Sequence, residues 1–510
     1  MLLAAGAISS CKKDFLDRKP LGELTYDTFF QTEDQAVQAT NAVYNQFRSW
    51  ECVALGYIGI TDIISDDADK GSTLNDQPLL ADIDNFNFDA ANTFFSQVWT
   101  GYYRAITRAN LAIKRIPDVP DMDDNLRKRL VGECKFMRAY SYFLLVQWFG
   151  DIPVITEPLS ADEYYNRVRQ PVAEVYGQIE RDLLDAIDAL PKKSQYAASD
   201  KGRITKGAAQ GILAKLYMLK KQYGQASQLC LDVINSNEYS LLPKYADNFL
   251  PVGENGAESM FEINAAALQP DAGGVIGPGA TPYNMVQGVR GNPNLGWGFN
   301  RPSDNLVTSY ENGDPRREAT VIYVGEILPD GATQVQDNPD IVNERFNQKA
   351  WVPSHPGLQD NGPGNIRVLR YSDILLLAAE ALNEDNKPGD ALIYLNQVRK
   401  RARHEQFHPA GHHHHRSGAV ARTHLQGAPV RTGNGTAPLV RSAALGACCR
   451  CDAGRRQKLC SEQTRIAADP ADRNRSDGRK HPAKSELLKE TDLNRKPTRI
   501  EFARVSCFFT

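Results

Sequence analysis

One segment of the 510-residue chain constrains its fold more than any other. Residues 132–155 read GECKFMRAYSYFLLVQWFGDIPVI, and residues 134–148 contain neither Gly nor Pro. Apolar or aromatic side chains fall in nearly every turn of the helix that this pattern predicts, and such a helix must be buried on several sides. Gly150 is typical of the position just after a helix, and Pro153 prevents the helix from resuming. The segment therefore predicts a central helix in the core of a large helical protein.

The charge of the chain is divided unevenly. The formal net charge is −3, but the residues after Arg403 hold 19 Lys and Arg against 10 Asp and Glu, so the body of the protein is acidic. An acidic body argues against nucleic acid as a partner. The 42% hydrophobic content supports a sizeable core, and the length allows two or three domains or one large elaborated domain.

The first eleven residues, MLLAAGAISSC, are typical of the end of a bacterial lipoprotein signal. Residues 8–11 would form the lipobox, and acyl chains on Cys11 would anchor the protein to a membrane without a spanning helix. The chain lacks a basic segment ahead of the apolar run, which a start codon placed too far downstream would explain. A Cys that follows an apolar run by chance is the alternative. No later run approaches the ~18 apolar residues of a membrane span.

Helical periodicity dominates the rest of the first half. Apolar residues recur every three or four positions, which predicts helices over 34–50, 93–116, 126–149 and 172–190. Two later stretches each predict a pair of helices around a short turn, at 205–221 with 225–235 and at 371–383 with 388–402. The first pair resembles a tetratricopeptide helical hairpin, and such hairpins stack so that each covers the apolar face of the next. Cys134 and Cys230 fall within these helical patterns and are expected to be small core residues.

Residues 243–364 differ in composition from the helical parts. They are rich in Gly, Pro and Asn and carry aromatic residues at irregular positions. Residues 258–264 alternate in polarity and predict a short strand, whereas the remainder shows no clear period. The aromatic content argues against disorder. We therefore expect a loop-built lobe that carries ligand contacts.

The body of the chain offers little material for catalysis. It contains no P-loop, no G-x-S-x-G and no H-E-x-x-H pattern, and its one histidine is His355. We therefore expect no catalytic residues, no metal site and no cofactor. Carboxylates are numerous, so a glycosidase-type pair stays open, because only a structure reveals their separation.

Sugar binding requires less, because an aromatic ring can cover the apolar face of a pyranose while planar polar groups bond its hydroxyls. The candidate aromatic platforms are Trp50, Tyr57, Tyr283, Trp297, Phe299 and Trp351. The candidate polar groups are Asp66, Asp67, Asn294, Asn300 and Arg301. Core packing is the alternative role for each aromatic residue. We favour 296–300, since glycines on both sides of Trp297 leave a ring more easily exposed. The Ser65-Asp66-Asp67 run has a structural alternative in turn formation.

The last part of the chain, 404–510, has a different character. It contains no Trp, Tyr or Met and shows almost no helical or strand period, so we expect a disordered basic tail. A frameshift near codon 404 is the simplest explanation, and a genuine basic extension or a fused linker are the alternatives. Its four consecutive histidines and its C-C-x-C cluster lack the paired ligand spacing of a zinc site.

Three motifs in this order resemble the SusD/RagB family of Bacteroidetes outer-membrane lipoproteins. They are DFLDRKPLGELT after Cys11, R-A-Y-x-Y-F-x-L-x-x-x-F-G-D-I-P from Arg138, and RYSDILLLAAEAL from Arg370; S-D-D at 65–67 is a further family-like run. The resemblance covers residues 11–403 and stops where the tail begins. With the composition, it divides the chain into a signal remnant (1–10), a helical part (11–242), a loop-rich ligand-binding lobe (243–364), a last hairpin (365–403) and a tail outside the family pattern (404–510).

The resemblance implies a mainly α SusD-like fold and a non-catalytic surface lipoprotein. Such a protein would bind oligosaccharides or related nutrients at the outer membrane and deliver them to a SusC-like TonB-dependent transporter. Two other functions remain open: a glycoside hydrolase, and a helical-repeat adaptor that binds a protein partner.

Overall fold

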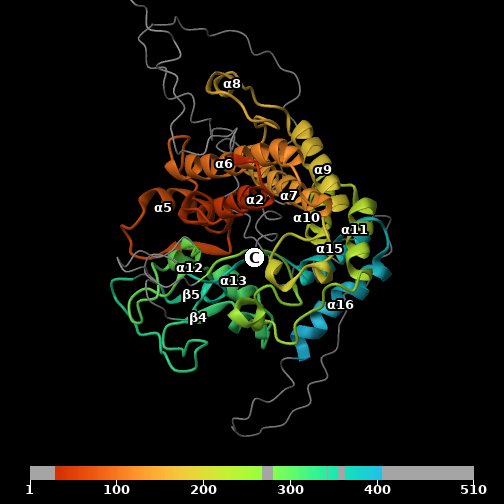
Figure 1. Ribbon diagram of the computed structural model, residues 1–510. Coiled ribbons are helices and arrows are strands. Elements are labelled where there is room, and N and C mark those ends of the chain that lie inside the picture. Colours follow the sequence, from red (N-terminus) through yellow and green to blue (C-terminus); the bar gives the residue numbers. More distant parts are fainter. Residues whose placement is uncertain (1–28, 267–278, 342, 354–361, 405–510) are drawn as a thin grey trace, which may run out of the picture.

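The computed structural model describes residues 29–266, 279–341, 343–353 and 362–404. The predictions for Cys11, His355 and residues 405–510 lie outside these ranges. The described chain is mainly helical, as predicted, with a second region of short strands and loops on one side (Figure 1). None of its helices combines the length and the hydrophobicity that crossing a bilayer requires.

The predicted helices are present, with boundaries shifted by a few residues. The longer helices are α2 (Glu33–Phe47), α6 (Thr93–Arg115), α7 (Asp124–Phe149), α9 (Val172–Ala189), α10 (Lys206–Leu219), α11 (Tyr223–Asn235), α15 (Tyr371–Glu384) and α16 (Pro388–His404). The helix predicted over 34–50 ends at Phe47, and a separate short helix, α3 (Trp50–Val53), follows it. The first half also contains the short helices α4 (Leu55–Ile58), α5 (Pro78–Asp84) and α8 (Ala161–Tyr165), and a π-helical turn, η2 (Gly59–Ile63).

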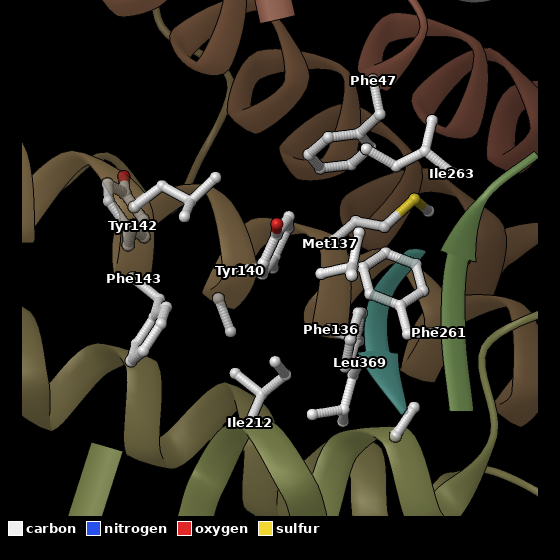
Figure 2. Close-up of a cluster of buried hydrophobic side chains, with 14 of the residues drawn as sticks. Phe47, Phe136, Met137, Tyr140, Tyr142, Phe143, Ile212, Phe261, Ile263 and Leu369 are labelled. Carbon is white, nitrogen blue, oxygen red and sulfur yellow. The ribbon is translucent and has the colours of Figure 1, made fainter. Parts of the chain in front are cut away.

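Helix α7 is the central element that the sequence predicts. The Asp123 carboxylate accepts a hydrogen bond from the Leu126 amide at its start, and Gly150, at a φ of 70°, ends it. The common core contains Phe47 of α2, Ile212 of α10 and Phe261, together with Phe136, Met137, Tyr140, Tyr142 and Phe143 of α7 (Figure 2). The edge of the Phe261 ring meets Phe136 at 5.0 Å and Tyr140 at 5.4 Å between ring centroids. The aromatic face of α7 thus packs against the strand that carries Phe261, β2 (Ser259–Ile263).

The two predicted helical hairpins stack on each other. Helix α10 packs against α11, α15 packs against α16, and α11 packs against α15, so the four helices form a continuous layer along one side of the molecule (Figure 1). Cys134 and Cys230 are fully buried in this helical core, as predicted.

Three two-stranded antiparallel sheets support the loop-rich lobe. Strand β1 (Ala68–Gly71) pairs with β3 (Phe299–Pro302), β2 (Ser259–Ile263) with β6 (Ile366–Arg370), and β4 (Val321–Tyr323) with β5 (Arg345–Asn347). The strand predicted over 258–264 is confirmed. The other strands, together with α12 (Pro282–Gln287), α13 (Asp304–Ser309) and α14 (Pro315–Glu318), have three to six residues each. These other elements show no clear period in the sequence.

The lobe has a small core of its own and is tied to the helices. Its core contains Val289, Ile322, Leu328, Val335, Phe346 and Trp351. Strand β1 comes from the helical part and pairs with β3 of the lobe, and β2 of the lobe pairs with β6, which leads directly into α15. The β1–β3 pair therefore fixes loops from distant parts of the chain beside one another.

Candidate functional site

The β1–β3 pair brings two charged side chains together across the sheet. Asp69 lies directly opposite Arg301, and the Arg301 Nη2 donates to Asp69 Oδ2 at 2.6 Å. The Asp69 side chain keeps 36% of its surface exposed and the Arg301 side chain 21%. The pair therefore offers planar hydrogen-bonding groups at the surface, while each charge is partly neutralised by the other.

The loop after β1 is held by two cations. The Lys70 ammonium donates to the carbonyl oxygens of Thr73 and Asp76, and burial lowers the pKa of this ammonium. Arg290 donates through Nη1 to Asp76 Oδ2 at 2.6 Å and to the Ser72 hydroxyl. About a third of the side-chain surface of both Arg290 and Asp76 is exposed. We call Asp69, Asp76, Arg290 and Arg301 the polar rim.

Glycines let the loop that follows β1 and the loop that precedes β3 approach each other closely. Gly71 has a φ of 68° and Gly298 a φ of 72°, and a Cβ on Gly71 would lie 2.5 Å from the Gly298 carbonyl oxygen. A Cβ on Gly296 would lie 2.3 Å from the Met285 carbonyl oxygen. Both glycines are thus required by backbone contacts. The glycines on both sides of Trp297 pack its backbone against α12, and the ring is half-buried.

Two of the predicted aromatic platforms meet at the surface. The Trp50 ring, 38% exposed at the start of α3, lies 5.7 Å from the Trp297 ring between centroids, with the two planes at 54°. The Trp297 amide donates to the Met285 carbonyl, which fixes the tryptophan to α12. Tyr283 is half-buried on the same helix, and burial raises the pKa of its hydroxyl. We call Trp50 and Trp297 the tryptophan pair.

The other predicted platforms are packed inside the protein. Phe299 is 1% exposed, and Tyr57 and Trp351 are each 5% exposed. Tyr57 packs its ring against Trp148, and Trp351 belongs to the core of the lobe. These three rings therefore have almost no surface on which a ligand could stack.

Some of the predicted polar residues make hydrogen bonds within the protein, and others are exposed at the surface. Asn300 is 4% exposed, and its amide group donates to Asp62 and Gln287. The backbone carbonyls of Asp66 and Asp67 accept hydrogen bonds from the hydroxyl and the amide of Ser303, which caps α13. Asn294 is exposed, and Arg301 belongs to the polar rim.

Sequence reasoning missed Asp69, Asp76 and Arg290. Arg290 is 214 residues from Asp76, and Arg301 is 232 residues from Asp69. Each partner stands in a short segment without a distinctive motif, so only the β1–β3 pairing and the folded loops beside it show that they are neighbours. Within the described ranges, no three His, Cys, Asp or Glu side chains are grouped as a metal ion would require.

Two models of known protein families together match most of the described chain. Residues 14–218 match the SusD-like family described as starch-binding and associating with the outer membrane, and residues 257–416 match the SusD family. SusD-like protein P25 of Formosa agariphila is 26% identical over 423 residues, which is 77% of this chain and 79% of that protein. A SusD-like protein of Bacteroides ovatus is 26% identical over 78% of this chain and 74% of its own length.

Solved structures agree with these matches. A laminarin-binding SusD-like protein superposes with a TM-score of 0.63 and 26% identity, over 73% of this chain and 85% of its own. Surface glycan-binding protein A from Bacteroides thetaiotaomicron, solved with laminarihexaose, has the same fold at a TM-score of 0.62 and 24% identity, over 73% and 83% of the two chains. With both parts of the chain matched in order and the helical scaffold shared, this protein belongs to the SusD family.

Proposed function

We propose that this protein binds glycans at the cell surface and that the tryptophan pair is its main contact. The observation that carries the proposal is the contact of Trp50 with Trp297, from distant parts of the chain, next to Arg290 of the polar rim, whose Nη1 lies 3.5 Å from the Trp297 carbonyl oxygen. Aromatic faces cover the C–H face of a sugar, and carboxylate and guanidinium groups bond its hydroxyls. Such a site requires no titrating group or metal, and it has no need of catalysis.

We further propose a β-glucan of the laminarin type as the ligand. The similarity to a laminarin-binding SusD-like protein supports this choice.

The delivery step rests on the sequence and on family membership. Cys11 would carry the lipid anchor at the outer membrane, and a SusC-like TonB-dependent transporter would receive the oligosaccharide. Co-purification of the wild-type protein with a barrel transporter, and loss of membrane association in Cys11→Ala, would support this step.

Calorimetric titration with laminarin tests the binding site. We expect Trp297→Ala to lose about 2 kcal/mol of binding free energy, roughly a thirtyfold rise in Kd, because a central aromatic contact is removed. Tyr165→Ala is the matched control, since Tyr165 is an aromatic residue of α8 with 85% of its surface exposed. Equal affinity of Trp297→Ala and wild type would refute the site, and release of reducing ends from laminarin would favour a hydrolase instead.

A further inference from the structure

Asp62 occupies an unusual backbone element behind the candidate site. It lies in η2, a π-helical turn that continues the α4 helix, and such turns often occur at functional positions. Its Oδ2 accepts a hydrogen bond from the Asn300 Nδ2 at 2.9 Å, across 238 residues of sequence. Asp62 therefore joins the N-terminal helices to strand β3, which begins two residues after Trp297.

Asn300 has a backbone conformation that needs support. Its φ is 61°, in the left-handed region that few residues other than Gly adopt, although Asn tolerates it better than most. Its amide nitrogen also donates to Gln287 Oε1 at 2.6 Å, and that oxygen accepts a second bond from Asn347. The Gln287 Nε2 donates to the Tyr283 carbonyl, which fixes the orientation of its amide. Asn300 is thus held from two sides, and one of them is the Asp62 carboxylate.

This network determines where Trp297 lies. Gln287 is the last residue of α12, and the loop from 288 to 298 leaves that helix and returns at β3. The bond between Asn300 and Gln287 closes this loop at its base. Within it, Gly298 donates to the Gly288 carbonyl and Trp297 to the Met285 carbonyl. A change at Asp62 is therefore transmitted to the tryptophan pair through Asn300 and the closure of the loop.

The surroundings of Asp62 shift the pKa of its carboxyl group upward. Burial raises its pKa from the usual 3.8 to about 6, opposed by the hydrogen bonds from Asn300 and Thr61 and by Lys349 of η8 (Gln348–Ala350), while Asp67 raises it further. Burial raises the pKa of the hydroxyls of Tyr57 on α4 and Tyr283 on α12, and the electrostatic effect of the Asp62 carboxylate raises both further. On the neighbouring elements α5 and β1, the Asp84 carboxylate accepts a hydrogen bond from the Lys70 backbone amide.

We propose that Asp62 is a positioning residue that makes glycan capture depend on pH. The ionised carboxylate holds Asn300 in its left-handed conformation and so fixes the loop that carries Trp297; proton uptake weakens this bond and loosens the tryptophan pair. A hydrogen bond to an ionised acceptor is about twice as strong as a neutral one. The choice of ligand rests on the proposed function, whereas the effect of Asp62 on Trp297 does not depend on it.

Laminarin titrations of the full chain at pH 5.0 and pH 7.5 test the proposal. We expect wild type to bind roughly fivefold more weakly at pH 5.0, as the loss of a charge-assisted bond predicts. Asp62→Asn keeps a side-chain oxygen as acceptor but cannot ionise, so it should bind at both pH values with the weaker affinity of wild type at pH 5.0. Asp118→Asn removes an exposed carboxylate and should keep the wild-type profile. Equal wild-type affinity at the two pH values would overturn the proposal.

A second measurement separates positioning from a purely structural role. Because burial raises the pKa of Asp62, its contribution to stability is fully present below pH 3.8 and is lost as pH rises through about 6. Asp62→Asn should therefore melt no lower than wild type at pH 7.5 while binding more weakly. A lower melting temperature together with weaker binding would assign Asp62 a structural role only.

Trp297 fluorescence distinguishes failure of this inference from failure of the proposed function. The wild-type spectrum minus that of Trp297→Phe should shift with a midpoint near pH 6 without ligand, and the same difference in an Asp62→Asn background should stay constant. A pH-dependent signal without any laminarin binding would refute the ligand but support the role of Asp62. A constant wild-type signal would overturn the inference.

Discussion

Arg138 gives the family-like motif in α7 its physical meaning. Its guanidinium donates to both carboxylate oxygens of Asp182 on α9, at 2.8 and 2.6 Å, and both side chains are about 95% buried. It also donates to Asn110 on α6 and to the Thr156 carbonyl. Four residues later, the Tyr142 hydroxyl donates to the Ile155 carbonyl and accepts from the Ile155 amide. The motif therefore binds three helices and the segment after Pro153 into one unit.

Removing one partner of this buried pair should be costly. We expect Arg138→Leu to lower the free energy of unfolding by about 3–5 kcal/mol, because Asp182 would be left buried without its counter-charge. Lys135 and Asp185 form a matched pair on the same two helices, at 2.6 Å but largely exposed on the acid side. Lys135→Leu should cost at most about 1 kcal/mol. Urea titrations of both variants measure the difference, and equal losses would contradict this role for Arg138.

At the scale of single residues, the sequence indicates which residue types form the candidate site better than it indicates where their side chains lie. Trp50 and Trp297 were candidates, and they do meet at the surface. Phe299 and Asn300 stand beside Trp297 in sequence, yet both are buried, because strand β3 turns them toward the core and toward Asp62. A loop without a period does not show which of its neighbouring side chains faces water.

Helices are the elements that the sequence predicts well. The periodicity of α6, α7 and α9 extends over five or more turns, so their boundaries are predicted within two residues. The strands of the lobe are three to five residues long, and their partners are distant in sequence. Their pairing follows from side-chain contacts across the fold and has no local pattern.

Close helix contacts at glycines provide a test at the scale of elements. A Cβ on Gly211 of α10 would lie 2.5 Å from the Leu369 Cδ2 and 2.9 Å from the Ile374 Cδ1, so these two fully buried side chains would have to shift within a packed cluster. We expect Gly211→Ala to destabilise the protein by about 1–3 kcal/mol through overpacking. Gly177 of α9 has only the end of Arg181 nearby, at 3.5 Å, so Gly177→Ala should instead stabilise by up to about 1 kcal/mol.

Chemical unfolding of the two alanine variants measures both effects. The opposite signs are the point of the comparison, because helix propensity alone would make both substitutions favourable. If Gly211→Ala is as stable as wild type, the close approach of α10 to β6 does not limit the packing of this layer.

In the whole molecule, the residues that support the fold and the residues proposed to contact the ligand lie in different elements. The helices form a packed scaffold with an interior of buried aromatic side chains (Figure 2). The exposed groups of the candidate site come from α3, from strands β1 and β3, and from the loops that follow β1 and precede β3. Family membership and the helical scaffold were predictable from the order of three motifs. The site was predictable only in its residue types, because its geometry depends on a β1–β3 pairing across more than 200 residues.

The central claim is that the tryptophan pair and the polar rim form a glycan-binding site. A crystal structure of the protein with a laminarin oligosaccharide tests it most directly. We predict sugar rings stacked on Trp297 and Trp50, with hydroxyls bonded to at least one group among Asp69, Asp76, Arg290 and Arg301. An oligosaccharide bound elsewhere, with Trp50 and Trp297 uncovered, would contradict the claim.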